Sequence, residues 1–156
     1  MRENTRIDWH ARVEQALARV FASLDEPLGW QTLAGELHAS PWHFHRCFRQ
    51  LTGETVKQCL RRLRLERAAF QAAQGEARIT DIALEAGFET LEAFLKAFRR
   101  AHGISPGGVR KLGAWAGTIA APSNLHYAPG APRKHFFIAD KGDAHMDVKI
   151  TTLSPL

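Results

Sequence analysis

The chain has 156 residues and a formal net charge of +5, from 21 Lys and Arg against 16 Asp and Glu. That length suits one domain with or without a tail, and an apolar content of 45% beside 24% charged residues excludes wholesale disorder. Two cysteines cannot by themselves build a disulfide framework or a four-ligand zinc site. The polar start leads into no apolar signal segment, and no run of about 20 apolar residues occurs. We therefore expect a reduced, cytoplasmic protein that does not enter a membrane.

Helical periodicity, broken by short turn signals, continues to residue 112. Apolar side chains recur at three- and four-residue spacing, and no alternating strand pattern appears, so we expect an all-α fold. In chain order the expected helices lie at about 9–24, 30–37, 41–51, 56–74, around Ile82, at 91–101 and at 106–112. The residues expected to cap helices are Ser40, Thr80, Thr90 and Ser105, and a proline suited to the first helical position follows the first and last of these.

An internal repeat relates two parts of this helical region. Leu33-Ala34 and Ile82-Ala83 each precede a turn and a second helix, at an offset of 49 residues before the turn and 50 after it. Each copy is a short helix, a turn and a second helix, which is the helix-turn-helix plan. The matching residues of the second helices are Phe44, Arg46, Phe48-Arg49 and Gly53 in the first copy and Phe94, Lys96, Phe98-Arg99 and Gly103 in the second. We expect two helix-turn-helix subdomains joined by the long helix at 56–74.

The second helix of each copy has two faces when its residues are placed 100° apart. One face is apolar and is expected in the core: Phe44, Cys47, Phe48 and Leu51 in the first copy, Phe94, Ala97, Phe98 and Ala101 in the second. The opposite face carries Trp42, His45, Arg46 and Arg49 in the first copy, and Glu92, Leu95, Lys96 and Arg99 in the second. The outward set of the first copy fits a recognition helix, with Arg for guanine or phosphate, His as a hydrogen-bonding reader and Trp packing on sugar or a thymine methyl. The alternatives are that Trp42 folds back onto neighbouring helices and that the others are ordinary surface.

Positive charge gathers at residues 46–67, where seven Lys and Arg face two Glu, an excess equal to the whole net charge. Such a run is either a solvated helix face or an electrostatic footprint for phosphates.

The paired units, the long helix between them, Gly87-Phe88 in the second turn and the closing Gly103-Ile104-Ser105-Pro106-(x2)-Val109-Arg110 resemble the AraC/XylS transcription regulators, in their MarA/SoxS/Rob-like form. The resemblance covers about residues 7–112 and implies a double helix-turn-helix DNA-binding domain. In that family the two recognition helices, here about 41–51 and 91–101, enter successive major grooves.

The resemblance also implies site residues. Base-reading positions are Trp42, His45, Arg46, Glu92 and Lys96, with Leu91 and Leu95 beside the last two, and DNA-backbone positions are Ser40, Arg49, Thr90, Arg99 and Arg100. Two departures from the family pattern are Val109, where tyrosine is usual, and Glu92. The Glu92 carboxylate can accept from cytosine N4 but repels phosphates, and it equally suits a first turn as a partner of the helix dipole. We therefore expect the first helix to read sequence and the second mainly to position the protein.

After Gly113 the helical pattern stops and proline-rich segments begin. We expect a linker at 113–145, with strand-like stretches at 136–138 and 146–150. The last stretch resembles the start of a gyrase-inhibitor-like effector-binding domain, so 146–156 is interpreted as an incomplete domain, either truncated or a remnant. The alternative is an arm that folds back on the helices. A small-molecule effector is expected only with a complete C-terminal domain.

The sequence contains little that supports a metal site or a catalytic site. His43 and Cys47 share a helix face at metal-ligand spacing, but Cys47 belongs to the apolar arc and no third ligand sits nearby. We expect no metal, no cofactor and no enzyme activity. The predicted function is a sequence-specific, double-stranded-DNA-binding transcription regulator, an activator acting as a monomer and contacting RNA polymerase. The alternative is a protein-interaction module of this fold that binds polymerase or another regulator.

Overall fold

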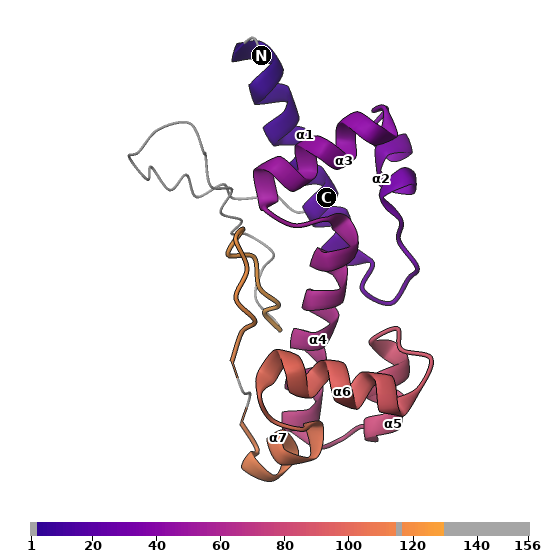
Figure 1. The fold of residues 1–156 in the computed structure, drawn as a ribbon, viewed down its shortest axis with the longest axis vertical. Coiled ribbons are helices and arrows are strands. Elements are labelled where there is room, and N and C mark those ends of the chain that lie inside the picture. The colour runs from indigo at the N-terminus through magenta and orange to yellow at the C-terminus, as the bar shows by residue number, and fades with distance from the viewer. Residues whose placement is uncertain (1–2, 115–116, 130–156) are drawn as a thin grey trace.

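The computed structural model describes residues 3–114 and 117–129. These residues contain helices and irregular segments and no strand, as the periodicity indicates. The helices are α1 (Glu3–Ala22), α2 (Trp30–Glu36), α3 (Pro41–Thr52), α4 (Val56–Gln74), α5 (Ile79–Glu85), α6 (Leu91–His102) and α7 (Pro106–Leu112), shown in Figure 1. None of the helices in this described part is long and apolar enough to cross a membrane.

The first unit is built from α1, α2 and α3, which bury their apolar faces against one another. Phe44 and Phe48 of α3 are fully buried, with ring centroids 5.8 Å apart, and Leu33 of α2 lies beside them in the same core. Removing such side chains from water stabilises the fold by roughly 1.5–3 kcal/mol each. The expected inner face of α3 is confirmed, with Cys47 also buried and Leu51 half-buried.

The second unit repeats this arrangement with α5, α6 and α7. Phe94 and Phe98 of α6 are fully buried with ring centroids 5.5 Å apart, and Phe88 in the preceding turn meets Phe94 edge-on. Val109 of α7 fills the same core. The residues that the repeat aligns, Phe44 with Phe94 and Phe48 with Phe98, therefore occupy equivalent buried positions.

Helix α4 takes part in both cores. Its first half, including Val56 and Leu63, lies in the core of the first unit, and its second half, from Leu65 to Ala72, lies in the core of the second. The helix begins with a capping box, in which Thr55 accepts from the Gln58 N–H and the Gln58 side chain accepts from the Thr55 N–H. Figure 1 shows α4 running from the end of α3 to the level of α6 and α7.

The helix ends follow the expected signals in part. Thr90 and Ser105 cap α6 and α7 as expected, each accepting a backbone N–H three residues on. Ser40 stands at the N-cap position of α3, but its side chain makes no capping hydrogen bond. The prediction that Thr80 caps a helix is wrong. Helix α5 already begins at Ile79, which packs against the second core, so the helical backbone starts before Thr80.

The residues after α7 follow the folded-back alternative as far as the structure describes them. Residues 117–129 form no helix or strand, and they lie along α4, where Leu125 enters the first core and Ile119 packs against the second. The strand-like stretches at 136–138 and 146–150, and the effector fragment at 146–156, lie outside the described residues.

Candidate nucleic-acid interface

The outward face of α3 is aromatic and basic. Trp42 is 74% exposed, and Arg46 and Arg49 are exposed one and two turns further along. Their spacing places them on the face opposite Phe44 and Phe48, whose burial fixes the rotation of the helix. The sequence-predicted arc is therefore formed, and its most exposed member is a large aromatic ring.

A residue that sequence reasoning missed supports this arc. Trp30, the first residue of α2, lies with its ring centroid 5.6 Å from that of Trp42 and 5.0 Å from that of His45. The contact leaves Trp42 exposed while limiting where its ring can move. The sequence signal for this support is a tryptophan at the start of the short helix that precedes the recognition helix.

His45 differs from the expectation of an exposed reader, because it is half-buried against Trp30. Its Nδ1 is buried and has no hydrogen-bond partner in the described part of the chain. Burying an unpaired N–H is costly, so a tautomer with its proton on Nε2 suits the site. Nε2 is then the atom that can donate to a base or a phosphate.

The outward face of α6 is different in character. Glu92, Lys96, Arg99 and Arg100 are exposed, and at one edge of this arc Leu91 and Leu95 expose 39% and 38% of their surface. Glu92 lies in the first turn of the helix, where a carboxylate complements the positive end of the dipole. The first turn of α3 has no acidic residue, so its free N–H groups and dipole remain available to an anion.

The two hydroxyls expected at the DNA backbone also differ. Thr90 is exposed, and its oxygen already accepts the Ala93 N–H at 3.1 Å, which leaves the hydroxyl hydrogen as a donor. Ser40 is exposed and its hydroxyl makes no capping bond. Both hydroxyls can therefore donate to a phosphate oxygen.

The basic run at 46–67 is divided between the surface and the interior. Its exposed members are Arg46, Arg49, Lys57 and Arg61, while Arg62 and Arg67 are buried and Arg64 is half-buried. The interpretation of the whole run as one footprint is therefore wrong. The three internal arginines also meet groups from distant parts of the chain, which no local pattern reveals: carbonyl oxygens for Arg62 and Arg64 and the Asp25 carboxylate for Arg67. The acidic partners of Arg62 are local, because Glu54 and Glu66 lie within the same run.

Arg64 and Arg67 join the turn after α1 to the end of α5 and the turn that follows it. Arg64 donates to the carbonyl oxygens of Leu24 (2.7 Å) and Glu26 (2.6 Å), and its guanidinium lies against Gly87. A Cβ on Gly87, whose φ is +83°, would lie 2.8 Å from the Arg64 Nη1. Arg67 pairs with Asp25 at 2.7 Å and also donates to the Glu85 carbonyl, at 2.9 Å. Part of the positive charge thus ties the two units together.

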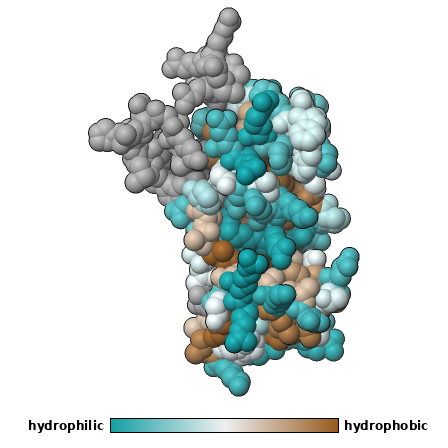
Figure 2. Space-filling view, in the orientation of Figure 1, coloured by the Kyte–Doolittle hydropathy of each residue, from teal (hydrophilic) through white to brown (hydrophobic). Residues whose placement is uncertain are grey.

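The two outward helices are arranged alike. In Figure 1, α3 lies at one end of α4 and α6 near the other, and both run across the molecule from the side of α2 and α5. Their N-terminal ends therefore face the same side. Figure 2 shows hydrophilic side chains gathered along the middle of the face it displays, from the first unit to the second. Arg61 of α4 is exposed and contacts the second unit, with its guanidinium 5.4 Å from the centre of the Phe88 ring.

Two helix-turn-helix units on one scaffold, each presenting its second helix, define a class of DNA-binding domain. A family described as helix-turn-helix domain matches residues 33–112. The chain belongs to this family, and its structural neighbours show it to be of the AraC type.

Two curated proteins illustrate the relationship. The transcriptional regulator Rob of Salmonella typhimurium is 30% identical over 93 residues, which are 60% of this chain and 32% of that protein. The regulatory protein SoxS of Escherichia coli K12 is 30% identical over 98 residues, 63% of this chain and 92% of that protein. This chain thus spans about a third of the length of Rob. The comparisons lend no support to a gyrase-inhibitor-like domain at the C-terminus.

Solved structures agree. An AraC-type transcriptional regulator from Chromobacterium violaceum superposes with a TM-score of 0.63 at 27% identity, over 69% of this chain and 96% of that one. The DNA-binding domain of AdpA in complex with a target DNA superposes with a TM-score of 0.58 at 29% identity, over 64% of this chain and 90% of that one.

Proposed function

We propose that this protein is a transcription regulator that binds double-stranded DNA in a sequence-specific manner. The observation that carries the proposal is the outward face of α3, where Trp42 and Arg46 are exposed at the N-terminal half of a recognition helix. The second unit presents α6 in the same way from the other end of the scaffold. The similarity to SoxS and to a domain solved on its target DNA supports the proposal.

Helix α3 reads bases in the major groove. Arg46 offers a planar fork for guanine O6 and N7, and His45 offers a donor from Nε2. Trp42 packs on a sugar or a thymine methyl group, held in place by Trp30. Arg49 and the Ser40 hydroxyl contact phosphates on either side, and the free N–H groups of the first turn support this anchoring.

Helix α6 mainly positions the protein on the DNA backbone. Lys96, Arg99 and Arg100 supply the charge, and the Thr90 hydroxyl donates to a phosphate. Glu92 can accept from cytosine N4, but it also keeps phosphates away from the N-terminus of α6. The sequence information at this half of the site is therefore smaller than at the half that α3 contacts.

The wider assignment is part of the same proposal. The protein acts by binding, without catalysis or a cofactor, as a cytoplasmic monomer that activates transcription through contact with RNA polymerase. A single chain with two recognition helices can contact both half-sites without a partner subunit, which supports a monomer.

The test is selection of binding sites from a random duplex library with the full chain. We expect a bipartite motif whose stronger half loses its base preference in Arg46→Ala, by roughly 5- to 150-fold for one good bidentate contact. The matched control is Arg78→Ala, which removes the same charge from an exposed arginine that directly precedes α5 and belongs to neither outward face. The control should select the same motif with similar affinity. If no motif emerges and binding does not depend on salt, the proposal is wrong.

A second candidate is a protein-interaction module, and the exposed Leu91 and Leu95 favour it because apolar surface on α6 suits a protein partner. The variant Lys96→Ala separates the two. As a backbone contact, Lys96 should weaken binding to all duplexes alike, whereas an unchanged affinity for every duplex would favour the protein partner.

A further inference from the structure

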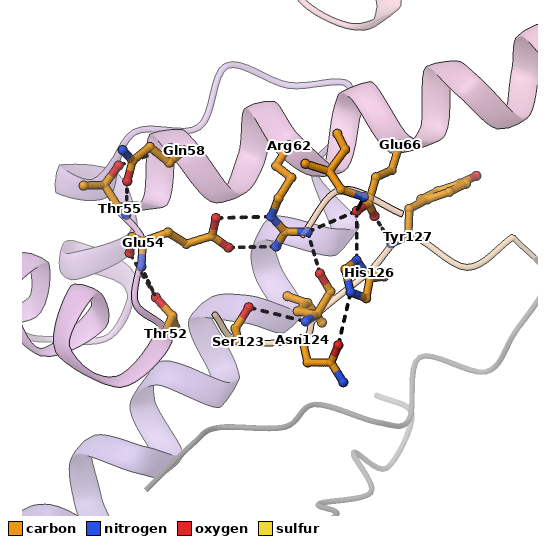
Figure 3. A network of polar contacts seen from close by, with 12 residues as sticks. Thr52, Glu54, Thr55, Gln58, Arg62, Glu66, Ser123, Asn124, His126 and Tyr127 are labelled. Atoms are coloured by element: carbon orange, nitrogen blue, oxygen red, sulfur yellow. Dashed lines mark hydrogen bonds and ion pairs between the residues drawn. The ribbon is translucent and has the colours of Figure 1, made fainter. Parts of the chain in front are cut away.

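Three buried charged side chains lie on and beside the middle of α4 (Figure 3). Arg62 makes a bidentate pair with Glu54, with Nη2 2.7 Å and Nε 3.2 Å from its two carboxylate oxygens. The Arg62 Nη1 also lies 3.3 Å from Glu66 Oε1. Glu66 is 0% exposed, and a single arginine shared with Glu54 leaves most of its hydrogen-bonding capacity unused. A carboxylate this deep is costly unless further donors reach it.

Those donors come from residues 117–129, which we call the clasp. The backbone N–H groups of Ile119 and Tyr127 donate to Glu66, at 3.0 Å and 2.7 Å, and the His126 Nδ1 lies 2.9 Å from the same carboxylate. The Leu125 carbonyl in turn accepts from Arg62 at 2.6 Å. The buried pair and the clasp therefore complete each other. Figure 3 shows the clasp running past both side chains.

The clasp also packs against both units. Leu125 is 2% exposed within the first core, and Pro122 sits against Gly53, where an added Cβ would collide with the proline ring. Tyr127 meets the Phe70 ring on α4, and Ile119 packs against the second core. One short segment is thus anchored in the first unit, on α4 and in the second unit.

The junction between the units is braced on two sides. On one side Arg64 and Arg67 connect the turn after α1 to the end of α5 and the turn that follows it. The clasp lies on the other side of α4, as Figure 1 shows. If the clasp were released, the arginine side alone would connect the units beside α4 itself, and the outward faces of α3 and α6 could then change their relative position.

We propose that the clasp fixes the relative position of the two helix-turn-helix units and thereby sets the spacing between half-sites that the protein accepts. The inference rests on the proposed function, because it concerns how two recognition helices reach successive major grooves about 34 Å apart. Glu66 is a positioning residue in this scheme and touches no DNA. When the clasp is released, the gain from binding both half-sites at once falls, since the second contact is no longer held in place.

The test compares two leucine truncations in the full chain. Leu125→Ala weakens the clasp, and Leu33→Ala is its matched control, because both residues are buried in the first core but only Leu125 belongs to the clasp. The probes are the selected duplex and a version with one extra base pair between its half-sites. The measured quantity is the dissociation constant for the lengthened duplex divided by that for the parent duplex.

We expect the control to keep the wild-type ratio even if its melting temperature falls. In Leu125→Ala the ratio should shrink by roughly three- to tenfold, because binding to the parent site weakens while the lengthened site is better tolerated. Glu66→Gln, which keeps the shape and removes the charge, should shift the ratio in the same direction. An unchanged ratio in both clasp variants overturns the inference.

A measurement without DNA separates this inference from the proposed function. Spin labels on cysteines introduced at Gln15 in α1 and Lys111 in α7, both exposed, report the distance between the units. The native Cys47 and Cys59 are buried and stay unlabelled. The distance distribution should broaden in Leu125→Ala and remain narrow in Leu33→Ala. A narrow distribution in both overturns the inference even where DNA binding is intact, and a failed site selection overturns only the proposed function.

Discussion

At the scale of single residues, His102 makes the second unit sensitive to acid. Its ring packs on Phe98 at 4.5 Å between centroids, and its Nε2–H donates to the Leu65 carbonyl at 3.1 Å. Burial lowers the pKa of His102 below its ordinary value of 6.5, although the carbonyl and the Glu66 carboxylate act in the opposite direction. The unfolded chain therefore binds this proton more tightly than the folded one.

This shift predicts a loss of stability as the pH falls from about 6.5 towards the lower pKa of the folded state, with the full contribution present above 6.5. His102→Gln keeps a donor for the Leu65 carbonyl and removes the titration. We expect its melting temperature to fall less than that of the wild type between pH 7 and pH 5, measured by circular dichroism. Using the difference between the two proteins removes the effect of the carboxylates common to both. A steeper fall in the variant would contradict the assignment.

At the scale of elements, the two recognition helices begin differently, and a pair of hydroxyl removals tests this. The Thr90 side chain caps α6, whereas the Ser40 side chain makes no capping bond at α3. Thr90→Ala should therefore lower the free energy of unfolding by about 1 kcal/mol, and Ser40→Ala by only a few tenths. Urea titration of both variants measures the difference. Equal losses would show that the Ser40 hydroxyl caps α3 in solution.

Elements were also the level at which the sequence was most informative. The inward faces of α3 and α6 follow from local spacing, because burial of Phe44, Phe48, Phe94 and Phe98 is dictated by helix geometry and hydrophobicity. Local spacing does not indicate which arginines are buried and which are exposed. Arg64 meets carbonyls 38 and 40 residues away, and Arg62 meets one 63 residues away, so their charge looks the same in sequence as that of Arg46. The support of Trp42 by Trp30 and the packing of the clasp on α4 depend on similar long-range contacts.

At the scale of the whole molecule, α4 makes two small units into one structure. Each unit alone has few residues with which to bury a core, and small domains are marginally stable for that reason. Sharing α4 lets Leu63 complete one core and Leu65 the other within a single turn of helix. The same architecture spreads the positive charge over two roles, with some arginines facing solvent and others holding the units together.

That division of charge predicts which arginines contribute to the salt dependence of DNA binding. Removing a side chain that neutralises one phosphate should reduce the slope of log K against log salt concentration by about 0.9, because fewer counterions are released. We expect this change for Arg99→Ala, whose side chain is exposed on α6. Arg64→Met should instead lower the melting temperature and leave the slope unchanged, because its guanidinium is bonded to Leu24 and Glu26.

The two variants remove one positive charge each, so they differ in where the charge lay and not in its amount. Filter binding on the selected duplex at four or more salt concentrations gives both slopes, and only folded protein is compared, below the melting temperature of the Arg64 variant. If Arg64→Met lowers the slope as much as Arg99→Ala, then net charge governs binding. If Arg99→Ala lowers the slope and Arg64→Met does not, then contacts made at the outward face of α6 contribute to the salt dependence, and Arg64 acts on DNA binding only by holding the units in position.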